Sequence, residues 1–426
     1  MERAKYEAAV RIALYSHDTM GLGHVRRNLL IAQALVGSAL EASILVIAGI
    51  HEAGAFRMPR CVDCLTLPAY HKDRNGDYLP RTLRVELAAL VSLRSQVIGA
   101  ALQHFTPDLF IVDNVPRGAL QELAPVLEHL RACGDSRCVL GLRDVLDEPD
   151  RLRQQWRLLD NENAIRDYYD AVWVYGDPML YDAATEYAFS PDIAAKTTFT
   201  GYLDPTVRLR AAGTGAGLPD ALPEELRRNG FTLCVIGGGQ DGMAVTQAFA
   251  RARLPPGEYG VIVTGPFLPL PYKRQLRDLI ADQPRFRLVE FLPDPLRLMA
   301  CATRVIAMGG YNTVLEILCL GKRALIVPRN RPRLEQTIRA QRLQALGLLD
   351  CIGFDELSPA ALSAWLNADA PVSPPALRQT VDCGGLKRIP ALAAALLSDS
   401  QRVRDCAGLP RAMPGWPGRE GDHAVV

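Results

Sequence analysis

One glycine-containing run, MGGYNTVLE at residues 308–316, constrains the fold of this chain more than any other segment. It stands between two apolar, strand-like runs, and it is typical of a strand, a glycine turn and the start of a helix. Gly309 and Gly310 let a ligand approach the backbone closely. A helix that begins near Asn312 or Thr313 directs free N–H groups toward an anion. The run therefore predicts a site for a phosphate or diphosphate group.

Glu316 lies one turn further along, where a carboxylate can accept hydrogen bonds from both vicinal hydroxyls of a ribose. The letters TVLE at residues 313–316 also fit a capping box, in which Glu316 would bond only the first amide of the helix. These residues alone leave both interpretations open. A second glycine turn, which includes Gly238, Gly239 and Gln240, precedes a helical stretch at residues 243–252. Two such turns in one domain favour a nucleotide site.

The composition limits the classes of function. The chain has 426 residues, of which 49% are hydrophobic, so it is long enough for two domains with full cores. A formal net charge of +1 gives no reason to expect nucleic acid as a partner. Among ten cysteines, the pair Cys61 and Cys64 has no second close pair that would complete a zinc site, so we expect no metal. Residues 1–7 lack the apolar core of a signal peptide and no segment has the length of a membrane span, so we expect a cytoplasmic protein.

Short apolar runs alternate with longer amphipathic stretches, which predicts an α/β fold built from βαβ units with parallel sheets. The predicted strands are residues 10–16, 43–48, 109–113, 137–142, 171–175, 197–201, 231–236, 260–264, 286–290, 304–307 and 323–327. The alternation lapses once, in a stretch rich in glycine, alanine and proline, which we interpret as a linker. The predicted organisation is a first doubly wound domain at residues 1–205, a linker at 206–228, a second domain at 229–372, a helical segment at 373–400 and a disordered tail at 401–426.

Two such domains would face each other across a cleft, and ligands of open α/β sheets bind at the carboxyl ends of the strands. The first domain has its own glycine turn there, with Gly21 and Gly23 followed directly by His24. The dipole at the first turn of a helix disfavours a charged imidazole, and a neutral histidine suits a general base. The alternative is a polar helix residue that only bonds a backbone carbonyl.

The ordered motifs of the second half resemble the nucleotide-sugar-binding domain of glycosyltransferase family 28, the group that includes the peptidoglycan N-acetylglucosaminyltransferase. The motifs are GGGQ at 237–240, VEFLPD at 289–294, GYNTVLE at 310–316, ALIVP at 324–328 and RLEQ at 333–336. In the first half the resemblance narrows to GLGH at residues 21–24. The resemblance implies a GT-B fold, with two Rossmann-like domains and the donor nucleotide held by the second.

The resemblance also implies site residues. Glu316 would bind the donor ribose, Glu335 and Gln336 the hydroxyls of the transferred sugar, and His24 would lie beside the acceptor and the diphosphate. Arg208 and Arg333 are the candidates for contact with the diphosphate. Such enzymes use no metal or other cofactor, since helix dipoles and backbone amides neutralise the leaving group. Gly239 and Gly309 replace serines that are usual in the family, and Glu335 replaces a glutamine, so the sugar stays undetermined.

The expected activity is metal-independent, inverting transfer of a sugar, taken as a UDP-sugar, in cell-envelope, polysaccharide or glycolipid synthesis. The acceptor is unknown; a lipid-linked or glycan acceptor and peripheral membrane contact are both left open. The first alternative is a nucleotide-sugar hydrolase of the pseudaminic acid pathway type, whose Gly-x-Gly-His-x-x-Arg loop is similar to residues 21–27. A second alternative is a non-catalytic nucleotide-sugar sensor, which would not need His24. A reversible epimerase of the same architecture is more distant.

Overall fold

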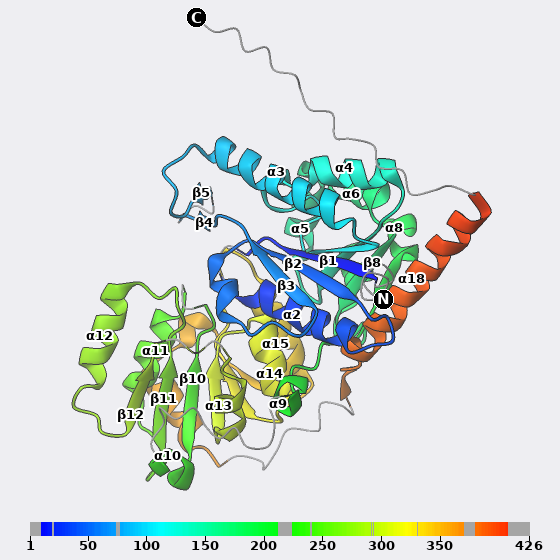
Figure 1. The fold of residues 1–426 in the computed structure, drawn as a ribbon. Helices are drawn as coiled ribbons and strands as arrows, with labels where there is room; N and C mark the ends of the chain where they lie inside the picture. Colours follow the sequence, from blue (N-terminus) through cyan, green and yellow to red (C-terminus); the bar gives the residue numbers. More distant parts are fainter. Residues whose placement is uncertain are drawn as a thin grey trace, which may run out of the picture.

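The chain folds into two domains, each built on a parallel sheet, which lie one above the other in Figure 1. The structure is a computed structural model, and it describes residues 10–18, 21–73, 77–211, 224–238, 241–290, 292, 294–329, 331–369 and 380–407. The predicted α/β class and GT-B arrangement are confirmed. None of the described helices is long and apolar enough to cross a bilayer.

The first domain contains a seven-stranded sheet in the order β3-β2-β1-β6-β7-β8-β9, and every neighbouring pair is parallel. Its inner strands are apolar between their ends, as expected for a sheet that is covered by helices on both faces. The strands are β1 (Arg11–Ser16), β2 (Ser43–Ala48), β3 (Val62–Thr66), β6 (Leu109–Asp113), β7 (Arg137–Arg143), β8 (Ala171–Tyr175) and β9 (Thr197–Phe199). A separate hairpin pairs β4 (Tyr70–Lys72) with β5 (Tyr78–Pro80) in antiparallel fashion.

The helices of the first domain cover both faces of this sheet (Figure 1). In the long helix α3, four of the buried residues, Leu90, Arg94, Ile98 and Leu102, recur at every fourth position and so form one stripe against the domain. The helices are α2 (Gly23–Val36), α3 (Leu87–Phe105), α4 (Ala124–Cys133), α5 (Pro149–Leu158), α6 (Asn161–Tyr168), α7 (Ala183–Glu186), α8 (Pro191–Ala195) and α9 (Val207–Ala211), with short 3-10 turns at His51–Ala55 and Ala119–Gln121.

The second domain contains a six-stranded parallel sheet in the order β12-β11-β10-β13-β14-β15. Its strands are β10 (Phe231–Val235), β11 (Tyr259–Val263), β12 (Phe286–Val289), β13 (Arg304–Ala307), β14 (Arg323–Ile326) and β15 (Asp350–Cys351). Its helices are α10 (Glu224–Asn229), α11 (Met243–Ala250), α12 (Leu270–Ile280), α13 (Leu296–Cys301), α14 (Tyr311–Cys319), α15 (Glu335–Ala345) and α16 (Pro359–Asn367), with a 3-10 turn at Phe354–Glu356.

The last helix, α18 (Gly385–Ala407), leaves the second domain and runs along the first, where it packs against α2 (Figure 1). Two backbone hydrogen bonds hold the chain against the first domain where α18 begins. The N–H of Tyr202 donates to the carbonyl of Asp382 at 2.8 Å, and the N–H of Gly385 donates to the carbonyl of Tyr202 at 3.0 Å. The helix continues beyond residue 400, so the start of the segment predicted as a tail is helical. Residues 408–426 lie outside the described residues, as do residues 212–223 of the predicted linker.

The two domains meet through buried polar contacts. Arg339 of α15 donates to both carboxylate oxygens of Asp144, which follows β7, with a shortest distance of 2.6 Å, and its Nη1 donates to the Gly309 carbonyl. Tyr311 of α14 donates its hydroxyl proton to the carbonyl of Tyr175 at 2.8 Å. Asp144 is fully buried, so these contacts fix the relative position of the two sheets.

Candidate active site between the two domains

A cleft of about 1200 Å³ opens between the carboxyl ends of the two sheets. The glycine turn before α2 and the hairpin β4–β5 line it from the first domain, while the start of α14 and the loop before α15 line it from the second. A typical pocket for one small ligand has roughly 300 to 1000 Å³. The cleft is therefore large enough to hold two substrates at once.

His24 lies in the first turn of α2 and forms a close pair with Asp113 at the carboxyl end of β6. The Nδ1 atom of His24 is 2.5 Å from Oδ2 of Asp113, and the side chain of His24 remains 20% exposed to the cleft whereas that of Asp113 is fully buried. An ionised carboxylate can only accept, so Nδ1 carries the proton and donates it to Asp113. The Nε2 atom is then left with a lone pair that can take a proton.

Asp113 is held ionised by its surroundings. Burial by itself would raise the pKa of this carboxyl, but the charge of Arg27 and the bonds from Arg27 and His24 outweigh burial and lower the pKa well below its usual range. The guanidinium of Arg27 spans both oxygens, with Nη2 2.7 Å from Oδ1 and 2.6 Å from Oδ2. This buried ion pair fixes the carboxylate that orients His24.

A second histidine, His17, packs against the first with its ring tilted. The ring centroids of His17 and His24 lie 4.5 Å apart, and Nδ1 of His17 is buried with no hydrogen-bond partner among the described residues. Burial lowers the pKa of His17 well below its ordinary value, and a proton on His24 would lower it further, so this ring is neutral. Gly49 makes the position possible, because a Cβ there would lie 1.9 Å from the carbonyl oxygen of His17.

The free backbone N–H groups at the amino terminus of α2 already have one acceptor within the protein, the side chain of Asp18. Oδ1 of Asp18 accepts from the backbone N–H of Val25 at 3.1 Å, and Oδ2 accepts from the Ser16 hydroxyl at 2.6 Å. A carboxylate in this position occupies the place where an anion would otherwise meet the helix. The start of α2 therefore positions His24 and is a poor site for a phosphate group.

The start of α14 is different. Gly310 is its N-cap residue, no side chain caps it, and no acidic residue occupies its first turn. Gly310, Tyr311, Asn312 and Thr313 all line the cleft, so the free N–H groups of this turn and its dipole face the open space. Because the helix begins at Tyr311, Thr313 is not the N-cap residue, and the capping-box interpretation of Glu316 is wrong.

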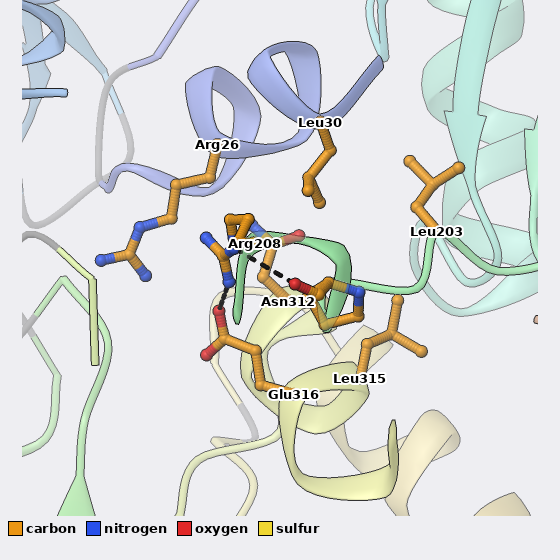
Figure 2. A pocket seen from close by; sticks show the side chains of 8 residues that line it. Arg26, Leu30, Leu203, Arg208, Asn312, Leu315 and Glu316 are labelled. Carbon is orange, nitrogen blue, oxygen red and sulfur yellow. Dashed lines mark hydrogen bonds and ion pairs between the residues drawn. The ribbon is translucent and has the colours of Figure 1, made fainter. Parts of the chain in front are cut away.

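Glu316 is buried beneath the cleft and contacts Arg208 of α9 (Figure 2). Its Oε1 accepts from Nη2 of Arg208 at 2.6 Å, while Oε2 is buried and has no partner among the described residues. Arg26 of α2 lines the same small pocket, whose volume of about 10 Å³ is room for a single water molecule. One carboxylate oxygen of Glu316 is thus free to accept, but the space beside it is closed by Arg208.

Glu335 and Gln336 begin α15 and both line the cleft. Nη2 of Arg329 donates to Oε1 of Glu335 at 2.8 Å, and Gln336 accepts from the backbone N–H of Arg329 at 3.2 Å. Burial would raise the pKa of Glu335, but the charges of Arg329, Arg143 and Arg339 outweigh it and lower the pKa. The charge of Glu335 is therefore balanced inside the protein.

The remaining predicted site residues line the cleft, lie below it or fall outside the described residues. Gly21, Gly23 and Gly238 line the cleft, whereas Gly309 packs below it, where a Cβ would lie 2.9 Å from atoms of Gln336. Gly239 and Gln240 lie outside the described residues. Arg333 lines the cleft on the side of the first domain, 3.8 Å from Asp147, and Arg208 lies beside Glu316.

Sequence analysis gave no individual role to four residues that the structure brings to His24 or to the wall beside it: Asp113, His17, Lys72 and Arg143. Each stands at or just after the carboxyl end of a strand: Asp113 ends β6, His17 follows β1, Lys72 ends β4 and Arg143 ends β7. That placement is the signal that could have found them. Among the described residues, no group of histidine, cysteine, aspartate and glutamate side chains is arranged to hold a metal ion.

Comparison with known proteins agrees with this geometry. Residues 232–373 match the model of the glycosyltransferase family 28 C-terminal domain. The whole chain is similar in fold to the glycosyltransferase SnogD from Streptomyces nogalater, with a TM-score of 0.51 and 17% identity over 94% of this chain and 100% of that one. It is also similar to a putative UDP-N-acetylglucosamine 2-epimerase from Listeria monocytogenes, with a TM-score of 0.62 and 14% identity over 92% and 98% of the two chains. No curated protein sequence matches the chain.

Proposed function

We propose that this glycosyltransferase family 28-like protein of GT-B fold moves a sugar from a nucleoside diphosphate donor to a hydroxyl group of an acceptor, with inversion at the anomeric carbon. The observation that carries the proposal is the pairing of His24 with Asp113 at one wall of a cleft whose other wall presents the uncapped start of α14. A base and an anion site on opposite walls are what in-line displacement requires.

The reaction would be a single displacement. The acceptor oxygen forms a bond to the anomeric carbon while the bond from that carbon to the diphosphate oxygen breaks, and the electron pair leaves with the nucleoside diphosphate. Nε2 of His24 takes the proton of the acceptor hydroxyl, and the carboxylate of Asp113 stabilises the imidazolium that forms. General base action of this kind contributes roughly a hundredfold to ten-thousandfold. Positioning and stabilisation of the leaving group supply the rest.

The donor diphosphate would bind at the start of α14, where the N–H groups near Asn312 and Thr313 face the cleft. Free backbone amides and a helix dipole stabilise the negative charge that develops on the leaving group without a metal ion. Glu335 and Gln336, at the start of α15, would contact the hydroxyls of the transferred sugar. We take the donor to be a UDP-sugar and the product a cell-envelope glycan or glycolipid.

The ribose of the donor would bind Glu316, and this requires a rearrangement. The pocket beside the carboxylate holds about 10 Å³, far less than a ribose needs, and Arg208 closes it. The side chain of Arg208 must therefore turn away when the nucleotide enters. A guanidinium released at this point is suited to the donor diphosphate, since it forms paired hydrogen bonds with phosphate oxygens.

The second candidate is hydrolysis of the same donor, with water in place of the acceptor. The observation in its favour is that the His24–Asp113 pair would activate a water molecule equally well. The size of the cleft, about 1200 Å³, favours transfer because it leaves space beyond a bound donor. Both candidates use the same donor site, so they differ only in what attacks the sugar.

The test is a panel of UDP-, GDP-, dTDP- and CMP-sugars without acceptor. Donor binding is measured by calorimetry, and nucleotide release is followed in the same samples. We expect one donor to bind while release stays slow, and a His24→Ala variant to bind that donor with similar affinity. Rapid release that depends on His24 would establish the hydrolase instead. Absence of binding by every donor would refute the proposed function.

A further inference from the structure

Three cations from different elements line the cleft. Lys72 comes from β4, Arg143 from the end of β7, and Arg333 from the loop before α15, and all three line the cleft together with His17 and His24. The proposed donor contacts do not use them. We call these three residues the cation cluster.

The side chains of the cluster are not neutralised by close carboxylates. Among the described residues, no carboxylate forms an ion pair with Lys72 or Arg143, and Nε of Arg143 is buried without a hydrogen-bond partner. Lys72 instead lies over the ring of Tyr78, 4.4 Å from its centroid. The carboxylate nearest to Arg333 is that of Asp147 at 3.8 Å, which also lies 3.8 Å from Arg151.

The charges within the cluster are close enough to affect one another. Burial, with a smaller contribution from the charge of Arg333, lowers the pKa of Lys72 to about 8. The charges of Lys72 and Arg333 also contribute to the lowered pKa of His17. Burial lowers the pKa of Arg143 to about 10; Glu335 opposes this shift, whereas Arg27, Arg339 and, least of the three, Arg333 add to it. Mutual repulsion of this kind is unfavourable in the free protein and is relieved when an anion binds.

Glu335 and Asp113, two acidic residues near the cluster, each have a closer cationic partner outside it, although the charge of Glu335 also acts on Arg143. Arg329 holds Glu335, and Arg27 together with His24 holds Asp113. Asp73 follows Lys72 on the cleft wall and forms an interaction of its own. The cluster therefore keeps an excess of positive charge beside the proposed base.

From this geometry we propose that the cation cluster is an anion subsite for the acceptor, so that the substrate whose hydroxyl attacks the donor carries a phosphate or carboxylate group. The inference rests on the proposed function. Paired N–H groups of a guanidinium and a lysine ammonium are the groups that recognise such anions. The ring centroid of His17 lies 4.5 Å from that of His24, and both rings line the cleft together with the three cations, so an anion held by the cluster would share the cleft with the proposed base. No bond to the anionic group changes during transfer.

The test uses sulfate and acetate as probes on the protein saturated with UDP, or with whichever nucleoside diphosphate binds. Occupying the donor site first leaves only a second anion site to be measured. Binding is followed by calorimetry at constant ionic strength, with chloride as the balancing ion. The variants are Lys72→Met and Arg333→Met, and the matched control is Lys387→Met, which removes an exposed cation from α18.

We expect one saturable anion site, with affinity lowered about tenfold or more in each cluster variant and unchanged in Lys387→Met. Nucleotide affinity should be the same in the wild type, Lys72→Met and Lys387→Met; a loss of nucleotide affinity in Arg333→Met would place Arg333 on the donor diphosphate and overturn its assignment to the cluster. Stronger sulfate binding would indicate a phosphate on the acceptor, and stronger acetate binding a carboxylate. Equal anion binding in every variant, or none in the nucleotide-bound protein, would overturn the subsite. Failure of every nucleotide to bind would instead refute the proposed function and, with it, the assignment to an acceptor.

Discussion

His24 and Asp113 lie 89 positions apart in the chain, yet Nδ1 of the histidine is 2.5 Å from Oδ2 of the aspartate. The aspartate holds the imidazole with its proton on Nδ1 and its lone pair on Nε2, toward the cleft. His24→Gln should therefore lower kcat by about a hundredfold to ten-thousandfold and leave donor affinity almost unchanged. Steady-state kinetics and calorimetry measure the two quantities separately. A variant that keeps full turnover would remove His24 from the reaction.

Asp113→Asn supplies the second half of this prediction. An amide does not stabilise an imidazolium and can hold the wrong tautomer, so kcat should fall by a similar factor. Arg27 would then lose its carboxylate partner, and a buried charge without a partner typically costs 3–5 kcal/mol of stability. Urea unfolding distinguishes the two effects, because His24→Gln leaves the pair of Arg27 and Asp113 intact.

Glu316 is expected to recognise the ribose hydroxyls of the donor. Glu316→Gln should weaken binding of the nucleoside diphosphate by about 1–3 kcal/mol, since an amide accepts one hydroxyl proton where a carboxylate accepts two. The wild-type protein should also prefer UDP to 2′-deoxy-UDP, and the variant should lose most of that preference. Calorimetry with both nucleotides on both proteins forms a complete double-mutant cycle. Equal preference before and after substitution would place the ribose elsewhere.

The contact between the domains gives a prediction on stability. Asp144 is fully buried and pairs with Arg339, of which only 2% is exposed, so Asp144→Ala should destabilise the protein by about 3–5 kcal/mol. Glu186 pairs with Arg342 across the same interface, but both side chains are partly exposed, and Glu186→Ala should cost at most about 1 kcal/mol. Chemical unfolding of both variants measures the difference. Similar losses in the two would show that burial does not decide the strength of this contact.

The sequence predicts the local parts of this structure well. The glycine turn before α14, the buried strands and the alternation of strand and helix depend on neighbouring residues, so they can be recognised in one short window. The strand β3 escapes prediction because its letters VDCLT include polar and exposed positions at the edge of the sheet. The hairpin β4–β5 escapes because three-residue strands carry too little pattern.

The site itself depends on contacts that no local pattern contains. Asp113 meets the loop of His17 and His24 because β6 pairs with β1 in a register that places Tyr15 opposite Val112. That pairing is decided by how the whole sheet assembles. Arg208 covers Glu316 for a similar reason, since 108 positions separate the two residues. Motifs therefore identify the donor side, whereas the acceptor side becomes visible only in three dimensions.

The pH dependence of anion binding tests the cation cluster further. The pKa of Lys72 is lowered to about 8, so the free protein carries this charge below pH 8 and loses it above. An anion binds the charged form better, and sulfate affinity should therefore be highest below pH 8 and should fall as the pH rises from 7 to 9. Around Lys72, burial raises the pKa of Tyr78 and lowers that of His17, so both stay neutral, and the pKa of Arg143, lowered by burial to about 10, stays above this range.

Lys72→Arg is the control for this titration, because an arginine in that place keeps its charge throughout the range. Its sulfate affinity should stay nearly constant between pH 7 and 9, while that of Lys72→Met should be low and equally flat. Sulfate itself does not change its charge in this range, so any slope belongs to the protein. Calorimetry at pH 7, 8 and 9 on the three proteins, each saturated with nucleotide, measures the effect. A slope that persists in Lys72→Arg would assign the titration to another group and separate Lys72 from the anion site.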